Sequence, residues 1–173
     1  MKKRLSLIQM DVHVNEVEYN YVRVQELLSQ ALSEKPDIIV LPETWNTGFH
    51  PSKDLINISD RNGERTKALL STFAKEHNVN IVGGSVAVAK EDLVFNTSYA
   101  YNREGTLVGE YSKMHGFSPA KEDQYFASGT HTTHFELDGI PCSTVICYDI
   151  RFPELVRMAA LSNTELLFVP AQW

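Results

Sequence analysis

Cysteine is scarce in this 173-residue chain, which contains only Cys142 and Cys147. These positions lie an odd number of residues apart on one predicted strand, so the two side chains face opposite sides and a disulfide between them is not expected. Two free thiols favour a reducing compartment, and we therefore expect a cytoplasmic protein. The six histidines are scattered and no Cys/His spacing suits a metal ion, so no metal site is expected.

Long apolar runs and an excess of basic charge are also missing. No apolar stretch reaches the ~20 residues that a membrane helix needs, and Gln9, Asp11 and His13 interrupt the N-terminal pattern before a signal peptide could form. The net charge is −6 and the one basic cluster is Lys2-Lys3-Arg4, which argues against a nucleic-acid partner. Without repeats or linkers, the length and the 43% hydrophobic share predict one globular domain over residues 1–173.

Hydrophobic periodicity indicates strands and helices of ordinary length, separated by turns rich in Gly, Pro, Asn and Asp. In chain order, the expected elements are a strand at 4–10, a helix from an N-cap at Asn15 to about Lys35, a strand at 37–41, a helix at 60–77, a strand at 80–88, hairpins at 93–111 and 134–147, a helix at 153–161 and a strand at 166–170. The Gly pair inside 80–88 suggests a bulge or a close backbone approach. This order predicts an α/β fold with a mixed sheet or two packed sheets and helices outside.

The stretch from Ser143 to Leu155 is the most informative part of the chain. A β-branched run ends at Cys147, and a helix is expected to begin within a few residues, with Pro153 in its first turn. A sharp strand-to-helix corner can expose a nucleophile, and the backbone N–H of Tyr148 would stand beside the thiol as an oxyanion donor. The alternative is a small buried hydrophobe, since a lone cysteine at a strand end is usually inert.

Two further reactive groups follow predicted strands. Glu43 comes directly after the strand at 37–41, and Lys113 follows the strand at 107–111. Ligands of open α/β sheets bind beyond the carboxyl ends of strands, so both side chains could share a site with Cys147. Each residue alone is weak evidence, because a Glu or a Lys after a strand is usually solvated. Together, a thiol, a carboxylate and an ammonium form a complete set for acyl transfer.

The blocks around these three residues resemble the catalytic blocks of the nitrilase superfamily of carbon–nitrogen hydrolases. The matching segments are Leu41-Pro42-Glu43-Thr44-Trp45-Asn46-Thr47-Gly48-Phe49, Tyr111-Ser112-Lys113-Met114-His115-Gly116-Phe117 and Ile146-Cys147-Tyr148-Asp149-Ile150-Arg151-Phe152-Pro153-Glu154-Leu155. Their order and spacing agree with the superfamily, and the resemblance covers residues 4–173. Arg151-Phe152-Pro153-Glu154 after the cysteine and Trp173 both suit the ω-amidase branch, which includes 2-oxoglutaramate amidases.

The resemblance implies an αββα sandwich with mixed sheets and a role for each matched residue. Cys147 would be the nucleophile and Glu43 the general base. Lys113 would favour the thiolate and, with the Tyr148 N–H, hold the oxyanion. Glu122 resembles a second glutamate that many members place near the base and the lysine, beside the substrate.

The resemblance also implies the reaction. A thioester would form with loss of ammonia and would then be hydrolysed by water, without a metal or a cofactor. The implied substrate is a small linear carboxamide, such as the ω-amide of a 2-oxo acid, and the implied assembly is a homodimer.

Several residues near the matched blocks leave alternatives open. His115 suits either a pocket wall or a hydrogen bond to a loop carbonyl. Arg151 suits either a substrate carboxylate or an ion pair with Glu154 or Asp149. Aromatic residues that suit either a pocket wall or the core are Phe117, Trp45 and Tyr125.

A second function hypothesis rests on length. Members of the superfamily normally continue well past the position of Trp173, so a scaffold that is incomplete at its C-terminus is expected. Uncovered sheet edges and an uncovered core face would follow. The alternative to an amidase is therefore a catalytically silent relative that serves only as a structural or partner-binding fragment.

Overall fold

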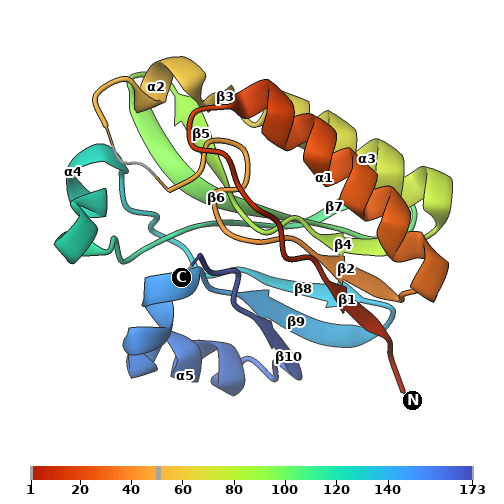
Figure 1. Ribbon diagram of the computed structural model, residues 1–173. Coiled ribbons are helices and arrows are strands. Elements are labelled where there is room, and N and C mark those ends of the chain that lie inside the picture. Colours follow the sequence, from red (N-terminus) through yellow and green to blue (C-terminus); the bar gives the residue numbers. More distant parts are fainter. Residues whose placement is uncertain (1, 50–51, 173) are drawn as a thin grey trace.

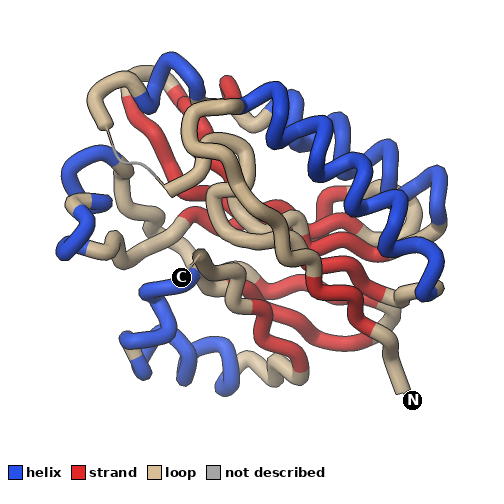
Figure 2. Tube along the Cα trace, viewed as in Figure 1, coloured by secondary structure: helices blue, strands red, loops and turns tan. Residues whose placement is uncertain are grey.

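Two β-sheets packed face to face between helices make up the computed structural model, which describes residues 2–49 and 52–172 (Figures 1 and 2). The strands are β1 (Leu5–Leu7), β2 (Ile38–Val40), β3 (Asp60–Arg61), β4 (Asn80–Val82), β5 (Val86–Lys90), β6 (Leu93–Tyr101), β7 (Leu107–Ser112), β8 (His134–Leu137), β9 (Ile140–Thr144) and β10 (Leu166–Phe168). The helices are α1 (Val17–Ala31), α2 (Leu55–Ile58), α3 (Glu64–His77), α4 (Glu122–Tyr125) and α5 (Pro153–Leu161), with short 3₁₀ helices η1 (Leu32–Glu34), η2 (Ser118–Ala120) and η3 (Cys147–Arg151).

Both sheets are mixed, as the sequence predicts. The larger sheet has the order β1-β2-β4-β6-β5-β3, with β7 paired to the other edge of β6. Its strands β1, β2 and β4 are parallel, whereas β6 runs antiparallel to β4, β5 and β7. In the smaller sheet, β9 is parallel to β10 and antiparallel to β8. The carboxyl ends of β2 and β9 therefore become candidate positions for a ligand.

The fold has four layers. Successive side chains of a strand point to opposite faces of its sheet, so each strand contributes to two cores. Ile39 and Leu41 face a core shared with α1 and α3, whereas Ile38 and Val40 face the core between the two sheets. Helix α5 lies on the outer side of the smaller sheet (Figure 1). The order of layers is thus helix, sheet, sheet, helix, which confirms the predicted fold class. No helix within 2–49 and 52–172 has both the length and the apolarity needed to cross a bilayer.

The first two predicted helices begin later than expected. Asn15 is not the N-cap of α1: its φ is +63°, and Glu16 directly precedes the helix. Residues 60–61 form a short strand and α3 begins at Glu64, because the carboxylate of Asp60 accepts the backbone N–H groups of Arg65 and Thr66. A side-chain acceptor placed several residues before the helix is difficult to distinguish in sequence from a first helical turn.

The predicted strand at 80–88 is two strands. β4 and β5 pair with different halves of β6, and Gly83 and Gly84 separate them. A Cβ at Gly84 would lie 2.0 Å from the carbonyl oxygen of Pro42, and φ there is +61°. The Gly pair therefore marks a close backbone approach, as predicted, and the approaching segment is the turn that carries Glu43.

Candidate active site

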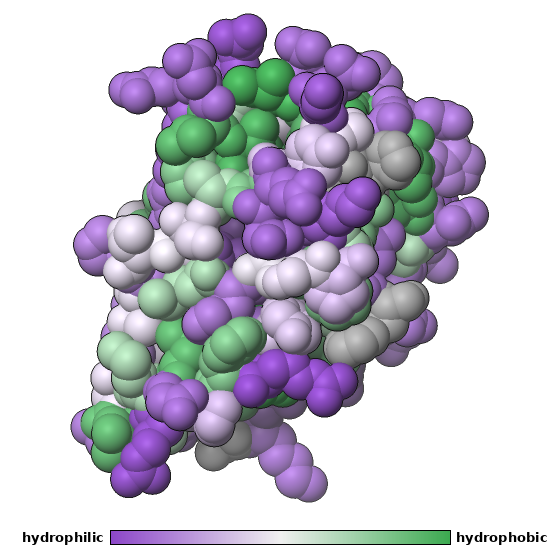
Figure 3. All heavy atoms as spheres, turned by 90° about the vertical axis from the view of Figure 1, so that its left-hand side faces the viewer, coloured by the Kyte–Doolittle hydropathy of each residue, from purple (hydrophilic) through white to green (hydrophobic). Residues whose placement is uncertain are grey.

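Three strand ends bring Glu43, Lys113 and Cys147 to one cavity. Glu43 lies three residues beyond the end of β2, Lys113 directly follows β7, and Cys147 is the first residue of η3 after β9. The cavity has a volume of about 340 Å³, and its other lining residues are Phe49, Phe117, Ala120, Tyr148, Arg151 and Gln172. On the side of the molecule that carries α2 and α4, polar and apolar residues alternate over the surface (Figure 3).

A buried charge cluster forms one wall of the site. The Nζ of Lys113 donates to Glu43 Oε1 at 2.8 Å and to Glu122 Oε1 and Oε2 at 3.0 and 2.8 Å. All three side chains are at most 3% exposed. Burial by itself lowers the pKa of Lys113, but the two carboxylates outweigh burial and raise it, so the lysine stays charged. Glu122 contacts Lys113, as expected, but does not itself line the cavity.

Asn96 completes the cluster, although it lies in none of the three matched blocks. Its Nδ2 donates to Glu43 Oε1 at 3.0 Å and to Glu122 Oε1 at 3.1 Å. The backbone carbonyl oxygen of Asn96 accepts the backbone N–H of Lys113 at 2.8 Å. The available signal was an asparagine in the interior of a predicted strand, a position that asparagine normally avoids.

Cys147 lies at a tight corner of the backbone. Cys147 has φ +46°, and such a left-handed conformation in a residue other than glycine costs on the order of 1–3 kcal/mol. Its N–H donates to the carbonyl of Pro170 at 2.8 Å, which fixes the corner to the segment after β10. Strand β9 ends at Thr144, three residues before the predicted end, and Pro153 is the first residue of α5 as predicted.

The thiol of Cys147 is neutral at rest. Burial, followed by the negative charge of Glu43, raises its pKa to about 12, and Lys113 acts in the opposite direction without overcoming them. Lys113 thus favours the thiolate, as expected, but burial and Glu43 together outweigh it. A thiol in this environment would have to lose its proton during an attack, and the carboxylate that acts on it is Glu43.

Asp149 connects the matched block that contains Lys113 to the matched block that contains Cys147. Its fully buried carboxylate accepts the backbone N–H and Nδ1 of His115 at 2.9 and 2.8 Å, the hydroxyl of Tyr111 at 2.7 Å and the N–H of Ile146 at 3.0 Å. The imidazole also stacks on Phe152, with ring centroids 3.6 Å apart. The partner of His115 is therefore a carboxylate and not a loop carbonyl, and this contact fixes the loop after Lys113 to the cysteine corner.

The other residues for which the sequence left alternatives open lie either at the cavity or in the core. Arg151 lines the cavity, and within the described part of the chain it forms no ion pair with Glu154 or any other carboxylate. Phe117 is a wall residue, whereas Trp45 is fully buried in the core under α1 and α3. Tyr125 packs with α2 in a separate cluster.

The segment after β10 supplies a contact to Glu43 that no sequence motif predicts. The N–H of Gln172 donates to Glu43 Oε2 at 3.0 Å, and its side-chain oxygen accepts the hydroxyl of Thr44 at 3.0 Å. Glu43 thus has donors on both carboxylate oxygens. Trp173, which the resemblance assigned to the ω-amidase pattern, lies outside the described residues.

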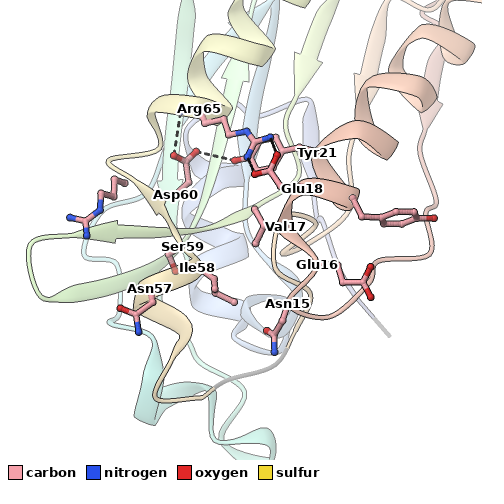
Figure 4. Close-up of a pocket in the computed structure, with 12 residues that line it drawn as sticks. Asn15, Glu16, Val17, Glu18, Tyr21, Asn57, Ile58, Ser59, Asp60 and Arg65 are labelled. Atoms are coloured by element: carbon pink, nitrogen blue, oxygen red, sulfur yellow. Dashed lines mark hydrogen bonds and ion pairs between the residues drawn. The ribbon is translucent and has the colours of Figure 1, made fainter.

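A larger cavity of about 650 Å³ lies elsewhere, between the start of α1 and β3 (Figure 4). Some of its charged side chains are tied together: Arg65 pairs with Glu18 and lies 3.7 Å above the ring of Tyr21, whose hydroxyl donates to Asp60. None of the predicted site residues lines it.

Over residues 2–49 and 52–172, no three His, Cys, Asp or Glu side chains gather in a way that could hold a metal ion.

Comparison with known proteins finds a matching family and several similar proteins. The carbon-nitrogen hydrolase family matches residues 4–173. The 2-oxoglutaramate amidase of Bacillus subtilis (strain 168) is 38% identical over 173 residues, which are 100% of this chain and 66% of that protein. The omega-amidase NIT2 of Danio rerio is 30% identical over 177 residues, covering 98% of this chain and 63% of that protein. The chain thus spans just under two thirds of the length of these relatives.

Solved structures agree on the fold. The NitN amidase from Neterenkonia sp. AN1 has a TM-score of 0.87 at 22% identity, and the match covers 98% of this chain and 67% of that one. XC1258 from Xanthomonas campestris, described as a CN-hydrolase superfamily protein with an arsenic adduct in the active site, has a TM-score of 0.84 at 27% identity, over 99% of this chain and 65% of that one.

Proposed function

The chain belongs to the carbon–nitrogen hydrolase family, and on that basis we propose that it is an amidase that cleaves the C–N bond of a small linear carboxamide through a cysteine thioester. The observation that carries the proposal is the meeting of a thiol, a carboxylate and an ammonium from three strand ends at one cavity. The cavity volume of about 340 Å³ suits a small molecule.

In the proposed first half-reaction, the sulfur of Cys147 attacks the amide carbon while its proton passes to Glu43. Because the thiol is neutral at rest, bond formation and proton transfer belong to one step. The oxyanion is stabilised by Lys113 and by the N–H of Tyr148, and one preorganised donor of this kind is typically worth about 3–4 kcal/mol. Glu43 then returns the proton to the nitrogen, the C–N bond breaks, ammonia leaves and a thioester remains.

In the second half-reaction, water attacks the thioester and gives a proton to Glu43. The C–S bond breaks, the acid is released, and the proton passes to the sulfur, so the thiol is restored. Glu122 holds the ammonium of Lys113 in place throughout. These steps use only the residues of the site and water.

We further propose that the amide carries an anionic group at its other end, as the ω-amide of a 2-oxo acid does. The support is Arg151, which lines the cavity together with Cys147. A guanidinium matches a carboxylate in a bidentate geometry. The name of the Bacillus subtilis relative, 2-oxoglutaramate amidase, agrees with this chemistry.

The main test is ammonia release from 2-oxoglutaramate and from a panel of short amides. Cys147→Ala is expected to lower kcat at least about 1,000-fold, because the covalent route is lost. Cys142→Ala is the matched control, since that thiol is buried between the sheets and away from the cavity. Equal rates for wild type and Cys147→Ala would remove this cysteine from the mechanism. A folded wild type that releases no ammonia would favour the catalytically silent alternative.

Arg151→Met tests the substrate class. We expect KM for 2-oxoglutaramate to rise about tenfold or more, because a charge-assisted contact is lost. The kinetics with butyramide, which is uncharged, should change little. An equal loss with both amides would mean that Arg151 does not recognise an anionic group.

A further inference from the structure

Asn96 occupies an unusual position in the charge cluster. It lies in β6, 1% exposed, and its side-chain amide bridges the two carboxylates that also bind Lys113. Its main chain accepts the N–H of Lys113, so one residue contacts the other three members of the cluster. Asn96 itself does not line the cavity.

The charges of the cluster explain why a donor is needed there. Glu43 and Glu122 place two carboxylates against the single ammonium of Lys113 in a buried site. A buried carboxylate without sufficient donors takes up a proton, and a protonated Glu43 could not accept one from Cys147. The N–H groups of Asn96 add donor capacity without adding charge.

The orientation of the amide supports this reading. Carboxylates only accept hydrogen bonds, so the nitrogen of Asn96 must face them and its oxygen must face away. Among the described residues that oxygen has no hydrogen-bond partner, although it is buried. An unpaired buried carbonyl is unfavourable, so the carboxylates and not the oxygen determine how the side chain lies.

We propose that Asn96 is a positioning residue that keeps Glu43 ionised and aimed at Cys147. This inference rests on the proposed function and adds a specific role within it. The ionisable groups around Glu43 are Lys113 after β7, Glu122 on α4 and Cys147 on η3, and Arg151 lines the same cavity. Of the uncharged groups, the Asn96 amide and the Gln172 N–H donate directly to Glu43.

The test is the pH profile of kcat/KM for two variants. In Asn96→Ala the anionic form of Glu43 loses a donor, so the acid limb should move to higher pH by about one unit, and activity at the acid end should fall about tenfold more than at the alkaline end. Asn96→Asp keeps the shape but replaces the donor with a third carboxylate, so we expect a larger shift. A role in packing alone predicts that Asn96→Asp resembles wild type.

Asn80→Ala is the matched control. Asn80 is also a fully buried asparagine in the same sheet, it also has an unpartnered side-chain oxygen within the described chain, and its nitrogen binds the carbonyl of Asp37. Its removal should lower the free energy of unfolding and leave the acid limb unmoved. A uniform loss of rate at all pH values in Asn96→Ala, or a wild-type profile in Asn96→Asp, would overturn the proposal.

A second readout separates this proposal from the proposed function. Carbon-13 NMR of the glutamate carboxyls, assigned with Glu43→Gln, follows protonation of Glu43 in protein that turns over no substrate. Asn96→Ala should move the Glu43 titration to higher pH even if the wild type proves inactive on every amide. An unchanged Glu43 titration would overturn the role of Asn96 whatever the activity.

Discussion

At the scale of single residues, the site combines a strained cysteine, the proposed nucleophile, with a thiol proton that is hard to remove. Cys147 takes a left-handed conformation and a thiol pKa raised to about 12, first by burial and then by Glu43. A resting thiol is protected from adventitious alkylation and oxidation, because the thiolate is the reactive form. The same carboxylate that suppresses ionisation at rest is the proposed acceptor of the proton during attack.

Glu43→Gln should therefore move the Cys147 thiol titration to lower pH, because a negative neighbour is removed while Lys113 remains. The ultraviolet absorbance of the thiolate, taken as the difference from Cys147→Ser, measures this directly. In wild type the thiolate should appear well above the ordinary value of about 8.5. A titration that moves upward in Glu43→Gln would contradict the assignment of Glu43 as the neighbour that raises the thiol pKa. The amidase activity of the same variant should be lost.

At the scale of elements, the break between β4 and β5 shapes the site. The turn after β2 packs onto that break: Ser85 donates its N–H to Pro42, and the indole of Trp45 donates to the carbonyl of Gly83 at 2.9 Å. Glu43 lies between these anchors. The backbone of the central strands thus fixes where the carboxylate points, as a rigid scaffold should.

Gly84→Ala should displace this turn, because the new Cβ would lie 2.0 Å from the Pro42 oxygen. We expect a loss of amidase activity and a free energy of unfolding lower by about 2 kcal/mol or more. Gly139→Ala is the control: φ is +79° there as well, but a Cβ would meet nothing within 4 Å. Urea unfolding and kcat/KM for both variants measure the difference, and equal effects would show that backbone strain alone is responsible.

At the scale of the whole molecule, an ion-pair cluster joins the two sheets at the end opposite the site. Arg103, in the turn after β6, donates to both oxygens of Asp138 at 2.8 and 2.7 Å and to Asp37 at 3.0 Å. Asp138 lies in the turn between β8 and β9, so the cluster connects the smaller sheet to the larger one. Lys3 adds a further contact to Asp138 at 2.8 Å. Homodimer formation and a cytoplasmic location stay predictions.

This cluster predicts how stability depends on pH. Arg103 and then Lys3 hold the pKa of Asp138 well below its ordinary range, despite opposition from partial burial. A lowered folded-state pKa gives stability that is fully present above the unfolded value of about 3.9 and is lost as the pH falls below it. Asp138→Asn should therefore be less stable than wild type at neutral pH, and the difference should shrink in acid. Asp92→Asn, at an exposed turn, is the control, and a difference that grows in acid would contradict the prediction.

Periodicity alone predicted most of the elements, because each buried face depends on local spacing. The helix at 153–161, the strands at 93–101 and 134–137 and the turn between β6 and β7 agree with the structure. The segments at 55–58 and 118–125 were not among the expected elements and contain short helices, since such helices owe their stability to contacts far away in the chain.

The sequence by itself determined which reactive side chains follow strands: Glu43, Lys113 and Cys147 are placed by local pattern, and strand ends in an α/β fold meet at common edges. Only the tertiary structure decided the electrostatics between them. Asn96 and Gln172 carry no motif, and their donors reach Glu43 only because β6 and the segment after β10 lie beside it in space. Burial and neighbouring charge fix the protonation of the thiol, and both depend on distances that a linear pattern does not contain.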